Sequence, residues 1–211
     1  PMLQRIYGPA FPSPKELRVH LATLEEAARR DHRKLGAQLK LFRSDATIGS
    51  GLPMLLPKGA VIRAELEKMI NRKLEDYGYD RLFSPHIGAI DLYRTSGHYP
   101  YYADSMYDPI KIDEREFLLK PMNCPMHIQA YTVEPRSYRE LPQRYAEFGT
   151  VYRMEQSGEL SGLVRVRGFT QDDGHIFCTD EQLKDEFKAC LQLVQEVMEV
   201  FGLETHCRVS L

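Results

Sequence analysis

The sequence predicts an α+β fold, in which helices flank an antiparallel sheet. Two segments, about 143–155 and 164–178, alternate their side chains at the period of two that is typical of strands. Residues 156–163 join these segments and contain Gly and Ser, which predicts a hairpin. Longer stretches repeat apolar residues at helical spacing instead. They span about 14–39, 60–76 and 180–201.

The composition is that of an ordinary globular protein, 43% hydrophobic and 27% charged over 211 residues. The 28 Lys and Arg against 30 Asp and Glu argue against a protein that holds nucleic acid mainly through its overall charge, and leave a local basic patch open. No apolar run approaches the ~20 residues that span a bilayer, and no secretory leader opens the chain. We therefore expect a cytoplasmic protein without membrane association, whose widely spaced cysteines stay reduced. These are Cys124, Cys178, Cys190 and Cys207.

Residues 1–48 predict a helical linker that leads into a larger domain. Ser13 is a suitable N-cap, with Pro14 at the first helical position and Glu16 placed to complete a capping box. Apolar residues then recur at helical spacing as far as Leu39, while charged residues fill the other face. The pattern predicts a packed helical pair with a solvated charged face. A basic helix that contacts a polyanion is the alternative.

A second domain is predicted over residues 49–211, because a Gly- and Pro-containing break at 49–53 separates it from the linker. Its first element is a helix over about 60–76. The apolar stripe of this helix comprises Val61, Ile62, Leu66, Met69, Ile70 and Leu74.

Short elements follow this helix. Residues 81–87 predict a strand, and Pro85 within it indicates a sheet edge or a strand end. Residues 117–120 predict another strand, and a short helix begins at about Asn123. The hairpin comes next along the chain.

The last helix begins at a second capping box, formed by Thr179 and Gln182, and ends at Gly202. Its apolar stripe is expected to face inward. The stripe comprises Leu183, Phe187, Leu191, Val194, Met198 and Phe201. Residues 205–211 predict a strand with no turn after it, so we expect a domain that is incomplete at its C-terminus.

Alternation along the hairpin places an unusual set of side chains on one sheet face. The first strand contributes Val151, Arg153 and Glu155 to this face. The second strand contributes Arg165, Arg167, Phe169, Gln171, Asp173 and His175. Arginines near an aromatic ring suit a nucleotide, because a guanidinium matches phosphate oxygens and the ring can stack on a base. A solvated face with incidental ion pairs is the alternative.

Thiols and imidazoles at short spacing suggest a metal site. Cys124 and His127 are three residues apart, as are His175 and Cys178, and zinc prefers this ligand set. A closed four-ligand site does not follow, because residues three apart on a strand point to opposite faces. A three-ligand open site with Cys124, His175 and another group remains possible, as do an ordinary structural histidine and a buried free cysteine.

Three motifs resemble the catalytic core of the threonyl-tRNA synthetases, which are class II aminoacyl-tRNA synthetases. They are Lys120-Pro-Met-Asn-Cys-Pro-Met-His127, Tyr152-Arg-Met-Glu155, and the run from Arg165 to Cys178. Residues 28–35 are similar to the segment that leads into that core. The helix over 60–76 resembles motif 1 of class II enzymes, which builds the dimer interface, and residues 153–169 resemble motif 2.

The resemblance implies an enzyme, threonine–tRNA ligase, that activates threonine with ATP and transfers it to tRNA(Thr). Arg153 would be the catalytic residue that holds the α-phosphate, and Glu155 would contact the adenine amino group. Phe169 would stack on the adenine, and Arg165 would lie nearer the terminal phosphates. Mg²⁺ is expected from the chemistry of ATP.

The resemblance also implies a threonine pocket with a zinc ion. Met122, Gln171 and Asp173 would line the amino-acid pocket. Cys124 and His175 match two of the three protein ligands of Zn²⁺. The metal would select threonine over valine, because an apolar pocket separates such isosteric pairs by only about a hundredfold.

Other parts of the family pattern do not occur in these 211 residues. They are the third zinc ligand, motif 3, the editing domain and the anticodon-binding domain. We therefore expect a truncated chain that forms a homodimer in the longer protein. The alternative function is a non-catalytic synthetase-like module for dimerisation, ligand sensing or nucleic-acid binding. Seryl and prolyl relatives share motif 2, but Cys124 with His175 and residues 171–173 favour the threonyl type.

Overall fold

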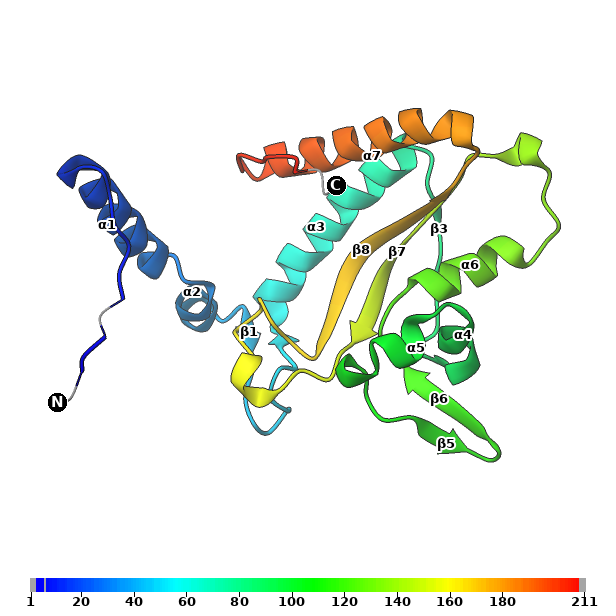
Figure 1. The fold of residues 1–211 in the computed structure, drawn as a ribbon, viewed down its shortest axis with the longest axis horizontal. Coiled ribbons are helices and arrows are strands. Elements are labelled where there is room, and N and C mark those ends of the chain that lie inside the picture. The colour runs from blue at the N-terminus through cyan, green and yellow to red at the C-terminus, as the bar shows by residue number, and fades with distance from the viewer. Residues whose placement is uncertain (1–2, 6, 209–211) are drawn as a thin grey trace.

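The computed structural model describes residues 3–5 and 7–208 (Figure 1). The helices and strands of the first half of the chain are α1 Pro14–Arg29, α2 His32–Leu39, β1 Phe42–Arg43, β2 Met54–Leu55, α3 Pro57–Asp76, β3 Asp80–Arg81, β4 Ile87–Ala89, α4 Ile90–Thr95 and α5 His98–Tyr101. The later elements are β5 Ile110–Ile112, β6 Arg115–Leu119, α6 Cys124–Thr132, β7 Gln143–Tyr152, β8 Gly168–Phe177 and α7 Asp180–Val200.

The long hairpin β7–β8 is the centre of the fold. Its strands are antiparallel and pair without interruption from Gln143 opposite Phe177 to Tyr152 opposite Gly168. The short strand β3 pairs parallel to β7 on the other side, so the sheet order is β3–β7–β8. A separate antiparallel sheet has the order β4–β6–β5, and β1 pairs with β2. The α+β fold with an antiparallel sheet is confirmed.

Helices α3 and α7 lie side by side over one face of the hairpin (Figure 1). Leu74 of α3, Ala146 of β7 and Leu193 of α7 form the buried core between them. Glu196 of α7 accepts hydrogen bonds from Lys73 Nζ at 2.9 Å and from the Tyr77 hydroxyl at 2.7 Å. A second core packs α4 against β6. The two helices leave the opposite face of the hairpin to α6.

The two strands of the hairpin end earlier than the alternation predicts. Beyond Tyr152 and Gly168 the chain leaves the ladder, because the Arg167 N–H donates to the Gly51 carbonyl at 2.7 Å. Arg165 and Arg167 therefore lie in the loop between the strands. The prediction that they share the strand face with Phe169 was wrong.

Helix α7 presents a different face to the sheet from the one predicted. Its capping box, formed by Thr179 and Gln182, is confirmed, and Gly202 follows the helix with a positive φ of 64°. The residues buried under α7 are Glu186 and Leu193. Glu186 turns inward because its carboxylate accepts from Arg144 Nε of β7 at 2.6 Å. The predicted inward stripe was wrong, since four of its members are exposed. They are Leu183, Phe187, Val194 and Phe201.

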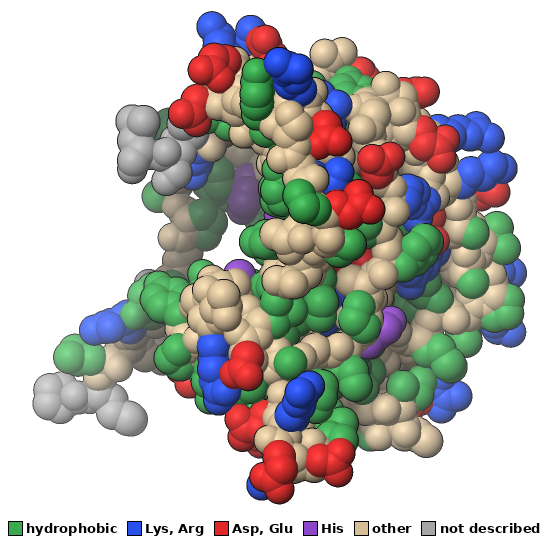
Figure 2. Space-filling model, turned by 90° about the vertical axis from the view of Figure 1, so that its right-hand side faces the viewer, with side chains coloured by type: hydrophobic (Ala, Val, Ile, Leu, Met, Phe, Trp, Pro, Cys, Tyr) green, Lys and Arg blue, Asp and Glu red, His purple; other side chains and the backbone are tan. Residues whose placement is uncertain are grey.

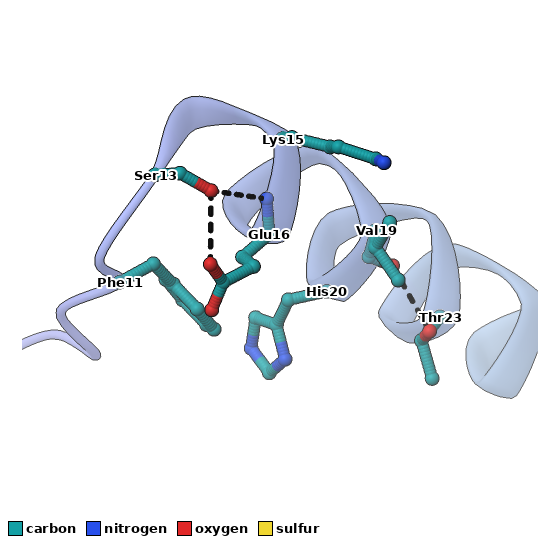
Figure 3. A pocket seen from close by; sticks show the side chains of 7 residues that line it. All are labelled: Phe11, Ser13, Lys15, Glu16, Val19, His20 and Thr23. Atoms are coloured by element: carbon teal, nitrogen blue, oxygen red, sulfur yellow. Dashed lines mark hydrogen bonds between the residues drawn. The ribbon is translucent and has the colours of Figure 1, made fainter.

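Helix α1 has no buried residue and extends away from the rest of the molecule (Figure 1). The packed helical pair predicted for this region was therefore wrong. The Ser13 side chain accepts from the Glu16 N–H, which confirms the N-cap (Figure 3). The reciprocal half of the predicted capping box is absent, because Glu16 accepts from the Ser13 hydroxyl instead of its backbone N–H.

Of three further predicted strands, the structure confirms one. Residues 117–120 lie largely in β6, as predicted. The single strand predicted over 81–87 was wrong, because β3 ends at Arg81 and β4 begins at Ile87, in another sheet, with Pro85 between them. Residues 205–208 form no strand, and 209–211 lie outside the described residues.

The surface carries charges of both signs. Acidic and basic side chains lie next to one another on the face shown in Figure 2, with apolar side chains between them. This mixture matches the formal net charge of −2. In the part of the chain that the structure describes, every helix is too short or too polar to cross a bilayer.

Candidate functional site

The face of the hairpin opposite α3 and α7 collects most of the chemistry-bearing residues. Opposed residues of an antiparallel pair share a face. The register pairs Val151 with Phe169, Gly149 with Gln171, Glu147 with Asp173, and Tyr145 with His175. Helix α6 covers the far end of this face, where the Tyr131 and Phe177 rings stack with centroids 4.1 Å apart. We call this surface the α6 face.

At the open end of the α6 face, an arginine lies over an aromatic ring. The Arg153 guanidinium carbon is 5.2 Å from the centroid of the Phe169 ring, and both side chains are half-buried. Arg153 is fixed just past the end of β7, because its N–H donates to the Arg167 carbonyl at 2.9 Å. The pair offers a cation and a flat apolar surface at one place.

Glu155 and Arg165 pair with each other beside this open end. Arg165 Nε donates to Glu155 Oε2 at 2.9 Å, and Arg165 also contacts Glu159 at 3.3 Å. Hydrogen bonding to Glu155 raises the pKa of Arg165. Because the Arg165 side chain is half exposed, solvent screens this pair and it contributes little to stability. The Arg165–Glu155 pair can therefore separate so that each side chain binds a ligand instead.

Arg167 stabilises the hairpin loop, whereas Arg165 lies beside the open end of the face. The sequence pattern did not distinguish these two roles. The Arg167 guanidinium donates to the Glu155 carbonyl at 2.9 Å and to the Ser50 carbonyl at 3.2 Å. These bonds tie the hairpin loop to the turn that precedes β2. A third bond, to the Ser157 hydroxyl at 3.4 Å, leaves the Arg167 guanidinium committed to acceptors within the protein.

The hairpin loop is also held by the linker. The Leu163 N–H donates to His32 Nε2 of α2 at 2.9 Å. Gly162 has a positive φ of 51°, and a side chain there would collide with the His32 ring. The loop that carries Arg165 is therefore positioned by a helix more than 100 residues earlier in the chain.

We expect His32→Ala to loosen this loop. Loss of one hydrogen bond of about 1 kcal/mol predicts amide exchange at Leu163 that is about fivefold faster. Hydrogen exchange followed by mass spectrometry measures this change. The matched control is His20→Ala, because His20 packs on Phe11 (Figure 3) and belongs to α1, which extends away from the hairpin (Figure 1). Equal exchange in the two variants would contradict the linker contact.

Asn123 was missed by the sequence reasoning and lies at the middle of the α6 face. Its Nδ2 donates to Asp173 Oδ2 at 2.9 Å, and the side chain is 1% exposed. Gly149 makes room for it, since any side chain at that position would collide with Asn123. Asn123 Oδ1 is buried and has no hydrogen-bond partner among the described residues. An acceptor of this kind is suited to a ligand that donates.

Met122 and Gln171 flank the same area. Met122 precedes Asn123 and is half-buried, and Gln171 lies opposite Gly149. The spacing of Phe169 and Asp173 on β8 is four residues, or about 13 Å. The α6 face is thus long enough to hold a nucleotide at one end and a small polar molecule at the other.

The two predicted metal ligands come from different elements. Cys124 is the first residue of α6, and His175 lies near the end of β8. Burial, together with the Asp173 carboxylate, raises the pKa of the Cys124 thiol. Burial lowers the pKa of His175, and Asp173 opposes this shift. Asn123, which precedes Cys124, donates to Asp173. His175 follows Asp173 by two residues on the same strand face, so both predicted ligands lie near one carboxylate.

The donor types fit zinc, since a thiol and an imidazole are its preferred ligands. The described residues contain no group of three His, Cys, Asp or Glu side chains arranged to hold a metal ion. Cys124 and His175 alone would leave a zinc ion with coordination positions for other ligands.

A buried polar cluster lies on the same face of the hairpin, between β7 and α6, and was also missed. Glu147 accepts from Lys120 Nζ and His127 Nε2, each at 3.2 Å, and from the Ser84 hydroxyl at 2.6 Å. Burial raises the pKa of Glu147, but the bonds from His127 and Ser84 and the charge of Lys120 outweigh it and lower the pKa to about 2. The His127 and His175 Nδ1 atoms are 3.0 Å apart. The cluster thus reaches the site through His175.

Comparison with known proteins identifies the family. The model of the tRNA synthetase class II core domain (G, H, P, S and T) matches residues 107–210, which include the whole hairpin. The chain belongs to the class II tRNA synthetase family. Threonine–tRNA ligase of Deinococcus radiodurans is 59% identical over 203 residues, which cover 96% of this chain and 31% of that protein. The Thermus thermophilus enzyme of the same name is 56% identical and has 98% and 32% covered.

Solved structures support the same family. A structure described as the RNA-binding domain of threonyl-tRNA synthetase from Cryptosporidium parvum superimposes with a TM-score of 0.79 at 41% identity, covering 82% of this chain and 43% of that one. Prolyl-tRNA synthetase of Giardia lamblia has a TM-score of 0.72 at 15% identity, which shows the class II fold alone. The resemblance to threonyl-tRNA synthetases is confirmed. The chain spans about a third of the length of the curated relatives it matches.

Proposed function

We propose that this chain is part of a threonine–tRNA ligase, in which the α6 face activates threonine with ATP and the longer protein transfers it to tRNA(Thr). One observation carries the proposal. The Arg153 guanidinium and the Phe169 ring lie on the same face as the polar pocket around Asp173. Phe169 and Asp173 are about 13 Å apart along β8. The 55–59% identity to proteins named threonine–tRNA ligase supports the choice of amino acid.

ATP would bind at the open end of the face. Phe169 stacks on the adenine and Glu155 accepts from the adenine amino group. Arg153 binds the α-phosphate, and Arg165 leaves Glu155 to bind the terminal phosphates. Mg²⁺ accompanies the phosphates of ATP.

Threonine would bind at the other end, among Met122, Gln171 and Asp173. The Asp173 carboxylate accepts from the threonine amino group, and the unpartnered oxygen of Asn123 offers a second acceptor. Both acceptors are held in place before the ligand arrives. A group that donates N–H bonds is therefore preferred in this part of the pocket.

The chemical step needs positioning and positive charge. A carboxylate oxygen of threonine attacks the α-phosphorus of ATP, the bond from that phosphorus to the bridging oxygen breaks, and pyrophosphate leaves. Arg153 stabilises the charge that develops on the α-phosphate oxygens. The reaction requires no enzyme nucleophile, because the substrate supplies the attacking oxygen.

We further propose that Cys124 and His175 are zinc ligands, with the remaining ligands supplied by substrate, water or a further segment of the longer protein. Cys124 and His175 would hold the ion, which would supply coordination positions for the neutral amino group and the hydroxyl of threonine and so select against valine, which has no hydroxyl.

Substitution of Cys124 by serine tests the zinc ligands. We expect Cys124→Ser to lose stoichiometric zinc, because a serine hydroxyl is a much poorer zinc ligand than a thiolate. Metal content after dialysis is the measurement. The matched control is Cys190→Ser, since Cys190 is exposed on α7. Unchanged zinc in Cys124→Ser would remove Cys124 from the ligand set.

Threonine-dependent exchange between ATP and labelled pyrophosphate tests the activation step. The 211-residue chain, supplied with zinc and magnesium, should catalyse exchange with threonine and serine and not with valine. Equal exchange with valine would refute zinc selection. Absence of exchange in both this chain and a full-length relative carrying the same residues would refute the activation chemistry and favour a non-catalytic module.

We also propose a homodimer through the N-terminal half of α3. Val61 and Ile62 are 64% and 49% exposed, although Leu74 further along the same predicted stripe is buried. Exposed apolar side chains grouped on one helix indicate an interaction surface. We also propose a domain division at residue 49 and a cytoplasmic location, both on the sequence alone. Strands β1 and β2 pair with each other from opposite sides of residue 49.

We expect Ile62→Glu to weaken the dimer. Burying a carboxylate in an apolar interface costs about 2 kcal/mol or more, so the dimer dissociation constant should rise by roughly 30-fold. Analytical ultracentrifugation measures it. Lys68→Glu also adds a carboxylate to α3, at an exposed polar position, and should leave the dimer intact. Equal effects of the two variants would contradict an interface at Ile62.

A further inference from the structure

A row of polar side chains leads to His175 from between β7 and α6. It runs from Ser84 through Lys120, Glu147 and His127 to His175 Nδ1. Lys120, Glu147 and His127 are 1%, 4% and 0% exposed. The reaction proposed above uses none of these three. Burying charged groups so deeply is costly unless each is paired, so the pairing has a definite order.

The directions of the hydrogen bonds are set from the Glu147 end. The contacts with Lys120 and Ser84 keep Glu147 as a carboxylate, which can only accept. His127 Nε2 lies 3.2 Å from the carboxylate and must therefore donate its N–H. A proton is thus fixed on this nitrogen.

The charge balance decides the other nitrogen of His127. Lys120 already neutralises Glu147, so a neutral His127 leaves the buried cluster without net charge. A protonated His127 would add an uncompensated cation in a place without solvent. His127 is therefore neutral, and its Nδ1 atom is an acceptor.

The accepting Nδ1 atom of His127 determines which nitrogen of His175 carries a proton. The Nδ1 atom of His175 lies 3.0 Å from the accepting Nδ1 of His127 and must carry a proton, which leaves the lone pair on Nε2. We propose that His127 and Glu147 are positioning residues that hold His175 in the Nδ1–H tautomer, with its Nε2 atom free to bind a zinc ion. The ring planes meet at 71° with centroids 4.6 Å apart, so the contact also fixes the orientation of the His175 ring. The inference rests on the proposed function only for the identity of the metal.

The tautomer can be read without metal and without activity. In the metal-free, ¹⁵N-labelled 211-residue chain, long-range ¹H–¹⁵N spectra distinguish protonated from unprotonated ring nitrogens. We expect His175 to carry its proton on Nδ1 and His127 to carry its proton on Nε2. A proton on Nε2 of His175, or two protons on His127, would overturn the inference whatever the metal does.

Two substitutions of His127 test the consequence for the metal. His127→Gln keeps a donor for Glu147 and an acceptor for His175, whereas His127→Phe keeps the approximate size and removes both. In competition titrations with zinc, we expect binding to be about 10- to 100-fold weaker in His127→Phe and close to wild type in His127→Gln. Equal affinities in both variants would refute positioning by hydrogen bonds.

The outcomes separate this inference from the proposed function. If His127→Phe does not fold, the affinity of His127→Gln and the tautomer of the unmodified chain still decide, and a 10-fold loss in His127→Gln would count against the inference. Unchanged zinc in Cys124→Ser would instead refute the proposed metal site. The tautomer measurement would stand in that case, because it uses no zinc.

Discussion

Replacing Glu147 with alanine is expected to destabilise the fold by about 3–5 kcal/mol. The substitution leaves the buried Lys120 ammonium without a counter-charge, and His127 and Ser84 lose their acceptor. Urea denaturation followed by circular dichroism measures the free energy of unfolding. A loss below about 1 kcal/mol would contradict the pairing of Lys120 with Glu147.

The matched control removes both charges. The double substitution Lys120→Met with Glu147→Leu leaves no buried ion unpaired, so it should recover at least half of the stability lost in Glu147→Ala. The pH dependence gives a second check. Because folding lowers the pKa of Glu147 from 4.5 to about 2, its contribution is present above pH 4.5 and is lost as the pH falls toward 2. Glu147→Gln should flatten stability across that range.

Replacing Arg153 with alanine is expected to reduce threonine-dependent ATP–pyrophosphate exchange by about 10²- to 10³-fold. This is the usual loss when one preorganised donor to a developing negative charge is removed. The Arg153 side chain is half-buried over Phe169 and ends at a site where it can reach a phosphate. The expected change is in kcat more than in KM for threonine, since the proposed threonine site lies at the far end of the face.

An arginine in a similar setting provides the control for Arg153. The Arg139 guanidinium lies over the Tyr138 ring at 5.7 Å, on an exposed 3₁₀ turn before β7. Arg139→Ala also removes a cation from a ring, and exchange should stay within twofold of wild type. A similar loss in both variants would indicate a general effect on the fold and contradict a role for Arg153 in catalysis.

Local patterns predicted the hairpin and the order of its side chains well. Phe169, Gln171, Asp173 and His175 share a face because alternation depends only on the backbone of one strand. The N-caps at Ser13 and Thr179 were predictable for the same reason, since a cap needs only residues within one turn. The resemblance in residues 165–178 then supplied the family.

Features that depend on distant contacts could not be predicted. The strand β8 starts at Gly168 because Arg167 bonds to Gly51, more than 100 residues away in the chain. Helix α7 turns Glu186 inward because Arg144 needs a partner, and the helical period alone cannot choose that face over the apolar stripe.

The buried cluster between β7 and α6 was equally inaccessible from the sequence. Lys120 ends one sheet and Glu147 lies in the middle of another, and each residue by itself resembles an ordinary surface charge. Their pairing follows from the packing of the β4–β6 sheet and α6 against β7. Asn123 was missed for a related reason, because its role depends on the space left by Gly149.

The most direct test of the α6 face is a crystal structure of this chain with a non-hydrolysable threonyl-adenylate analogue and zinc. We expect the adenine on Phe169, the phosphate replacement at the Arg153 guanidinium, and the threonine amino group at Asp173. Density for the analogue on the opposite face of the hairpin, in the groove between Leu52 and Thr170, would contradict the proposed substrate site. So would an analogue on the α6 face whose threonine end lies at Phe169.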